Sequence, residues 1–115
     1  MHSLLLELNQ QSATIKASAI ISKDGVVMAA ALPHDMDEDS IGAISAALYS
    51  TSARSIQDLV GGVVEQIMVK GSYGHILMTH VGKEAVLTVI TKTHEELELI
   101  CLELKRTAEK LIPHI

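Results

Sequence analysis

The chain has 115 residues, 48% hydrophobic and 20% charged, which is enough for one globular domain over residues 1–115 with its own core. Only 2% of the residues are aromatic and the formal net charge is −5, so stacking surfaces are scarce, phosphates are repelled, and we expect no nucleic acid as a partner. Because no apolar run approaches the roughly 18 residues of a membrane span and the single cysteine cannot form an internal disulfide, we expect a cytoplasmic protein without direct membrane insertion.

The first predicted elements are a short helix and a β-hairpin. Residues 2–13 predict an amphipathic helix whose apolar face consists of Leu4, Leu5 and Leu8. Two β-type runs follow, over residues 15–22 and 26–32, and Asp24-Gly25 lies between them. An Asp-Gly pair between two such runs indicates a hairpin, because glycine tolerates the positive φ of the turn.

A long helix is predicted from Asp37 to Val60, with Asp37 or Asp39 as its N-cap and Gly61-Gly62 ending it. At about 100° per residue, the large apolar residues form one stripe that we expect to face the core: Ile41, Ile44, Leu48, Ile56 and Leu59. A second stripe, of residues that let another backbone come close, predicts contact with a second helix: Gly42, Ala46, Tyr49 and Ala53. A third stripe is polar and predicts contact with water or a partner: Ser50, Arg54, Gln57 and Asp58.

Three strands and a last helix complete the chain. The strands are predicted over residues 63–70, 74–81 and 85–92, and their short connections favour an antiparallel meander. Alternation places Ile76, Met78, Val86 and Ile90 on one face and Leu77, Val81, Leu87 and Val89 on the other. The segment Thr93-His94-Glu95-Glu96 resembles a capping box that opens a helix to Ile112. The predicted buried stripe of that helix is Leu97, Ile100, Cys101, Leu104, Ala108 and Leu111.

The element order is therefore α-β-β-α-β-β-β-α, which predicts an α/β (α+β) fold. We expect a three-layer sandwich around a central five-stranded antiparallel sheet. The first and last helices are expected on one face of the sheet and the middle helix on the other.

This order and spacing resemble the Roadblock/LC7 family of the prokaryotic small-GTPase-regulator type, which has a profilin-like architecture. The resemblance is carried by the Asp-Gly turn within residues 22–30, by the acidic cap before an Ala- and Ser-rich helix, and by the run from Ala46 to Ser50 followed by Ala53-Arg54. The closing meander and helix extend it over essentially the whole chain.

The resemblance implies a homodimer, or a heterodimer with a paralogous Roadblock subunit, in which the middle helices pack together and the third strands pair. Carried onto this chain, the implied dimer surface is Gly42, Ala46, Tyr49, Ala53, Val63, Glu65, Ile67 and Val69. The resemblance further implies binding to a small Ras-like GTPase and no metal or cofactor.

Candidate catalytic and metal-binding residues each have a simpler interpretation. Arg54 fits an arginine finger, yet an exposed helical arginine more often contacts solvent, a partner, or an acid such as Asp58 four residues later. His75 and His80 have opposite parity on one strand, so they cannot share a metal, and Cys101 lies on an apolar stripe. No glycine-rich segment leads into a phosphate-binding Gly-Lys-Ser or Gly-Lys-Thr, so we expect no nucleotide hydrolysis by the chain itself.

The leading hypothesis is a non-enzymatic dimeric regulatory or scaffold module that binds a small Ras-like GTPase and modulates its nucleotide hydrolysis. On this hypothesis the polar stripe with Ser50, Arg54, Gln57 and Asp58 is the partner-binding surface. Two alternatives are a small-molecule-binding sensor module and a structural adaptor without effect on GTPase turnover.

Overall fold

The computed structural model of the protein describes residues 1–93 and 95–115. The predicted order of helices and strands is confirmed. The elements are α1 (His2–Gln10), β1 (Ile15–Ser22), β2 (Val27–Ala31), α2 (Glu38–Leu59), β3 (Ile67–Lys70), β4 (His75–Val81), β5 (Ala85–Thr91) and α3 (Leu97–Leu111), followed by a short 3₁₀ turn, Ile112–His114.

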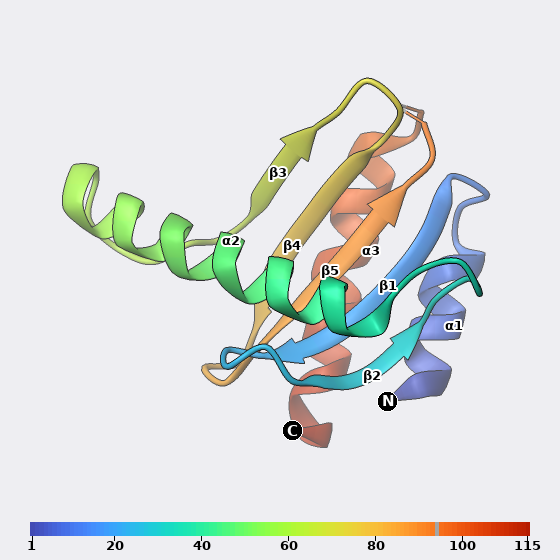
Figure 1. Ribbon diagram of the computed structural model, residues 1–115, viewed down its shortest axis with the longest axis horizontal. Coiled ribbons are helices and arrows are strands. Elements are labelled where there is room, and N and C mark those ends of the chain that lie inside the picture. The colour runs from blue at the N-terminus through green and yellow to red at the C-terminus, as the bar shows by residue number, and fades with distance from the viewer. Residues whose placement is uncertain (94) are drawn as a thin grey trace.

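The strands form one five-stranded antiparallel sheet in the order β2-β1-β5-β4-β3. Helices α1 and α3 cover one face, and α2 crosses the other face (Figure 1). The predicted three-layer sandwich is therefore confirmed. Within the sheet, β5 is the central strand, flanked by β1 and β4, and β2 and β3 lie at the two edges.

The β1–β2 turn is the predicted Asp-Gly hairpin. Gly25 has a φ of +93°, its backbone N–H donates to the carbonyl of Ser22, and the Ser22 N–H donates back to the carbonyl of Val26 at 2.8 Å. A residue with a Cβ rarely adopts this φ, which is why a glycine is needed in the turn.

Each face of the sheet has its own aliphatic core, as the strand alternation predicted. The core beneath α1 and α3 contains Leu77, Val81, Leu87 and Val89 together with Leu5, Leu8, Ile100, Leu104 and Leu111. The core beneath α2 contains Met78 and Val86, with Ile76 and Ile90 partly buried against it, together with Ile21, Ile41 and Ile67. Burial of these side chains on both faces anchors the helices on the sheet.

The start of the last helix differs from its prediction. Helix α3 begins at Leu97, and Glu96 before it has a left-handed φ of +58° and makes no side-chain cap. The Thr93 hydroxyl instead accepts from the Glu95 N–H at 3.2 Å, and the Glu96 carboxylate accepts from Ser12. The prediction of a capping box is therefore wrong for Thr93 and Glu96. His94 lies outside the described residues.

Two other predicted elements are shorter in the structure. The first helix ends at Gln10, and β3 comprises only Ile67–Lys70. Ahead of β3, the carbonyl of Glu65 accepts a hydrogen bond from the Thr79 hydroxyl, a side-chain contact in place of a ladder hydrogen bond. Residues 63–66 thus connect α2 to the sheet and do not extend it. No helix within the described residues is long and apolar enough to cross a membrane.

Candidate functional site

Helix α2 lies close to the β1–β2 turn at Gly42. Asp37 caps the helix by accepting from the Asp39 N–H. A Cβ placed on Gly42 would lie 2.5 Å from the carbonyl oxygen of Gly25 in the β1–β2 turn. Gly42 therefore lets the helix contact the chain's own hairpin. Its place on a dimer surface stays a prediction.

The rest of the small-residue stripe also faces the chain's own sheet. Tyr49 and Ala53 are half-buried and pack against the core beneath α2, and Ala46 lies beside Gly25. The Lys23 ammonium stands 5.5 Å from the centroid of the Tyr49 ring, within the range of a cation–π contact. Only part of this stripe remains accessible to another molecule.

The predicted apolar stripe of α2 is divided between core and solvent. Ile41 is buried and Leu48 and Ile56 are half-buried, but Ile44 is 53% exposed and Leu59 is 84% exposed. The helix is rotated so that its buried side is centred between the two predicted stripes. A buried hydrogen bond between the hydroxyl groups of Ser45 and Thr88, whose oxygens lie 2.9 Å apart, fixes this orientation. The prediction of core burial is therefore wrong for Ile44, which lies on the helix flank, and for Leu59.

Leu59 is exposed for a different reason. It lies five turns from Ile41, on the side of the helix that faces the sheet, but the C-terminal end of α2 extends past β3 (Figure 1). At 1.5 Å per residue, the 22 residues span about 33 Å, more than the width of five strands at roughly 4.8 Å spacing. Leu59 and Val60 thus overhang the edge of the sheet, and Val60 is 79% exposed.

The edge strand beneath this overhang is open. Strand β3 pairs only with β4, and Met68 and Val69 are 40% and 39% exposed. At the opposite edge, side chains of α1 contact the last two carbonyls of β2: Asn9 donates to Ala31, and His2 Nδ1 lies 3.0 Å from the Ala30 oxygen. In the part of the chain that the structure describes, no side chain covers β3 in this way, so β3 is the edge that remains free to pair.

The other residues predicted for a dimer surface fall into two groups. Val63 is 77% exposed and Glu65 is exposed, both in the connection ahead of β3. Ile67 is 9% exposed and packs into the core beneath α2, so its side chain contacts residues of its own chain.

The predicted polar stripe lies on the outer side of α2. Ser50, Arg54, Gln57 and Asp58 are all exposed. Arg54 and Asp58 form no ion pair, and among the described residues the only salt bridge joins Arg106 to Glu103. The Arg54 guanidinium is therefore available to a partner.

The described residues hold no metal-binding cluster. No group of three or more His, Cys, Asp and Glu side chains converges among them, and His75 is buried while His80 is exposed on the opposite side of β4. Cys101 is half-buried against the core beneath α3, as its position on the apolar stripe predicted.

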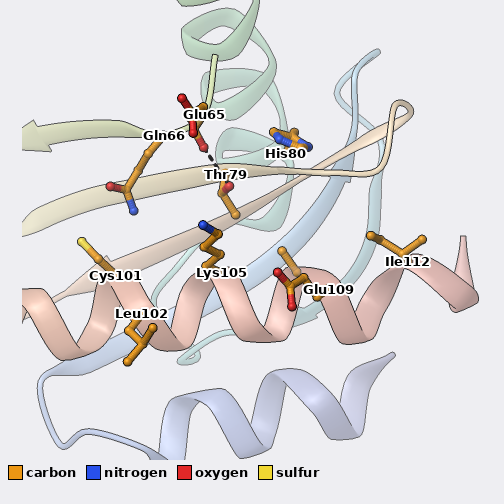
Figure 2. A pocket seen from close by; sticks show the side chains of 10 residues that line it. Glu65, Gln66, Thr79, His80, Cys101, Leu102, Lys105, Glu109 and Ile112 are labelled. Atoms are coloured by element: carbon orange, nitrogen blue, oxygen red, sulfur yellow. Dashed lines mark hydrogen bonds between the residues drawn. The ribbon is translucent and has the colours of Figure 1, made fainter. Parts of the chain in front are cut away.

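A hollow of about 450 Å³ lies between α3 and β4 on the other face of the sheet (Figure 2). Lys105 and Glu109 of α3 line one wall, and Thr79 and Glu65 line the other. Sequence reasoning missed this hollow because its walls come from three segments far apart in the chain. Only the packing angle of α3 on the sheet brings them together.

Comparisons with known proteins agree with this architecture. Residues 1–91 match the Roadblock/LC7 domain. An uncharacterized protein of Methanocaldococcus jannaschii, MJ1340, is 38% identical over 108 residues, covering 94% of this chain and 93% of that protein.

Three solved structures share the fold. The Roadblock/LC7 domain from Streptomyces avermitilis superposes with a TM-score of 0.93 at 19% identity, covering 99% of this chain and 96% of that one. Myxococcus xanthus MglB gives 0.90 at 19% identity, with 98% and 92% covered. Acanthamoeba castellanii profilin II gives 0.66 at 13% identity, with 98% and 97% covered, which supports the predicted profilin-like architecture. The chain belongs to the Roadblock/LC7 family.

Proposed function

We propose that the protein is a dimeric, non-enzymatic regulatory module that binds a small Ras-like GTPase and modulates its nucleotide hydrolysis. The observation that carries the proposal is the open edge of β3 beneath the overhanging end of α2. The kind of partner comes from the family resemblance, which implies binding to small GTPases.

In the proposed dimer, the β3 strands of two copies pair antiparallel about a two-fold axis. The second sheet then continues the first beneath the overhang and covers Leu59, Val60 and Val63, which are 84%, 79% and 77% exposed in the single chain. A hollow of about 300 Å³ between the end of α2 and the segment before β3, lined in part by Ile56 and Val64, offers room for a side chain of the other copy. Burial of such apolar surface is the main driving force for association.

The backbone of β3 is suited to this pairing. The Gly71 N–H donates to the Gly74 carbonyl, so these two residues form a hydrogen-bonded pair next to the turn. Bonded and non-bonded pairs alternate from there along β3 and β4, and in the observed register the residues bonded to β4 are Ile67 and Val69. Because bonding alternates along an antiparallel ladder, the N–H and C=O groups of Met68 and Lys70 point outward. These groups supply the hydrogen bonds to a second β3.

Two copies of α2 then lie side by side across the joined sheet. Ile44, 53% exposed on the helix flank, contacts the other helix in this arrangement. The exposed Ser50, Arg54, Gln57 and Asp58 of both copies form one polar surface on the outside of the dimer. This surface is where the GTPase binds in our proposal.

The test has two parts. Light scattering at micromolar concentration is expected to give twice the chain mass. Small Ras-like GTPases of the source organism, loaded with GDP or a GTP analogue, are expected to be retained by the immobilised protein in a nucleotide-dependent way. A monomer would contradict the dimer, and equal or absent capture of both nucleotide forms would leave the structural adaptor as the better description.

The hollow of Figure 2 favours a second candidate, the small-molecule sensor. A ligand held by Lys105 and Glu109 would raise the melting temperature of the protein, and Lys105→Ala would remove that increase. A metabolite screen by thermal shift in which no compound raises the melting temperature would count against this candidate.

A further inference from the structure

Part of the sheet face on which α2 packs is not covered by that helix. Helix α2 packs on β1, β2 and β5, while the ends of β4 and β5 nearest the β3–β4 turn lie clear of it (Figure 1). A hollow of about 410 Å³ opens there, and Ile76 and Ile90, which are opposite each other on β4 and β5, contribute apolar surface to it. Both side chains belong to the α2 side of the sheet.

The charged groups around this hollow are basic. Lys16 and Lys92 line it, both exposed, and within residues 1–93 and 95–115 no carboxylate lines it. Neither ammonium group has an ion-pair partner among the described residues. The chain as a whole carries a net charge of −5, so this is a local positive region on an acidic protein.

The rim of the hollow also presents an aromatic ring. Tyr73 is 94% exposed in the β3–β4 turn. The next residue, Gly74, has a φ of +158° and lies against the carbonyl of Thr91. A Cβ on Gly74 would collide with the Thr91 carbonyl oxygen. The turn is thereby held against β5 with the Tyr73 ring outward, and exposed tyrosines with a fixed backbone are typical of protein contacts.

We propose that this hollow binds an acidic segment of the GTPase partner. A carboxylate of that segment is attracted to Lys16 and Lys92, and an apolar side chain next to it packs on Ile76 and Ile90. The hollow lies on the same side of the sheet as the polar stripe of α2, so one partner can contact both. The inference rests on the proposed function and adds a second, electrostatic contact to it.

The test compares two charge-reversal variants of the full-length protein. Lys16→Glu with Lys92→Glu removes the positive region, while Lys83→Glu with Lys110→Glu changes two exposed lysines elsewhere and gives the same net charge. Binding of the GTPase is followed by biolayer interferometry at low and high salt. The first variant is expected to bind roughly tenfold more weakly, mainly through slower association, and to lose most of the salt dependence of the wild type.

The outcomes separate this inference from the proposed function. If both variants bind like the wild type, the hollow is not a contact and the proposed function stands. If both variants weaken equally, net charge alone steers the partner, which also overturns the inference. If the wild type binds no GTPase in either nucleotide state, the proposed function and the inference fail together.

Discussion

At the scale of single residues, Gly42 decides how α2 lies on the sheet. Its hydrogen points at the Gly25 carbonyl, where a Cβ would approach to 2.5 Å, and at Val27, where the nearest atom would be 3.1 Å away. A larger side chain must push the helix off the hairpin. Because Tyr49 and Ala53 pack through the same contact surface, the displacement would disturb the core beneath α2.

Gly42→Val is therefore expected to lower the free energy of unfolding by about 2–3 kcal/mol through overpacking. Ala43→Val, one position away on the exposed side of the helix, is the matched control and should cost less than about 0.7 kcal/mol, its propensity term alone. Urea unfolding followed by circular dichroism measures both. Equal losses would show that the close approach at Gly42 does not determine stability.

Arg54 is a second residue whose role is open to a direct test. In our proposal it contacts the GTPase without acting on the reacting phosphate. Arg54→Ala is expected to raise the concentration of protein needed for half-maximal stimulation of hydrolysis about fivefold to tenfold, as for a lost partner contact, and to leave the maximal stimulated rate unchanged.

Single-turnover hydrolysis at saturating protein separates this role from an arginine finger. If Arg54 were an arginine finger, its loss would reduce the maximal rate of stimulated hydrolysis by about 10³-fold or more. Lys110→Ala, on α3, is the control for removal of an exposed cation.

At the scale of elements, β3 and the end of α2 are exposed for one reason. The sheet ends at β3, while the helix above it continues. At the opposite edge, His2 and Asn9 of α1 contact the last two carbonyls of β2, so the two edges of the sheet are not equivalent. This asymmetry favours a closed dimer through β3 over an open-ended chain of sheets.

Met68→Pro tests the β3 edge. Its N–H points away from β4, so proline there removes no hydrogen bond within the chain but blocks a second strand. The variant is expected to be folded and monomeric by circular dichroism and light scattering. Val69→Pro is the contrasting variant, because its N–H bonds to β4 and its loss should destabilise the single chain. A dimeric Met68→Pro protein would refute pairing through β3.

At the scale of the whole molecule, dimerisation should appear in the stability of the protein. In the proposed dimer the exposed apolar side chains at the end of α2 and along β3 would be covered, which would link folding to association. The melting temperature is then expected to rise by several degrees for a hundredfold increase in protein concentration. Differential scanning calorimetry at both ends of that range measures the shift, and a melting temperature independent of concentration would contradict linked association.

The positions of most elements could be predicted from the chain alone. Strand alternation assigned the two faces of β4 and β5, and the periodicity of residues 97–111 identified the buried side of α3. These predictions succeed because side-chain direction follows directly from local backbone geometry. The predicted start of α3 was wrong because Glu96 adopts a left-handed conformation and its carboxylate accepts a hydrogen bond from Ser12, a residue 84 positions away.

What the sequence by itself determined is the order of elements, the Asp-Gly hairpin, the aliphatic character of both cores and the family. Only the tertiary structure decided the rotation of α2, because a helical wheel shows relative directions around the axis and not which direction the sheet occupies. Gly42 and Ser45 set that direction through Gly25 and Thr88, residues on other elements. The exposure of Leu59 likewise depends on where the sheet ends beneath the helix, a distance between elements that no local pattern encodes.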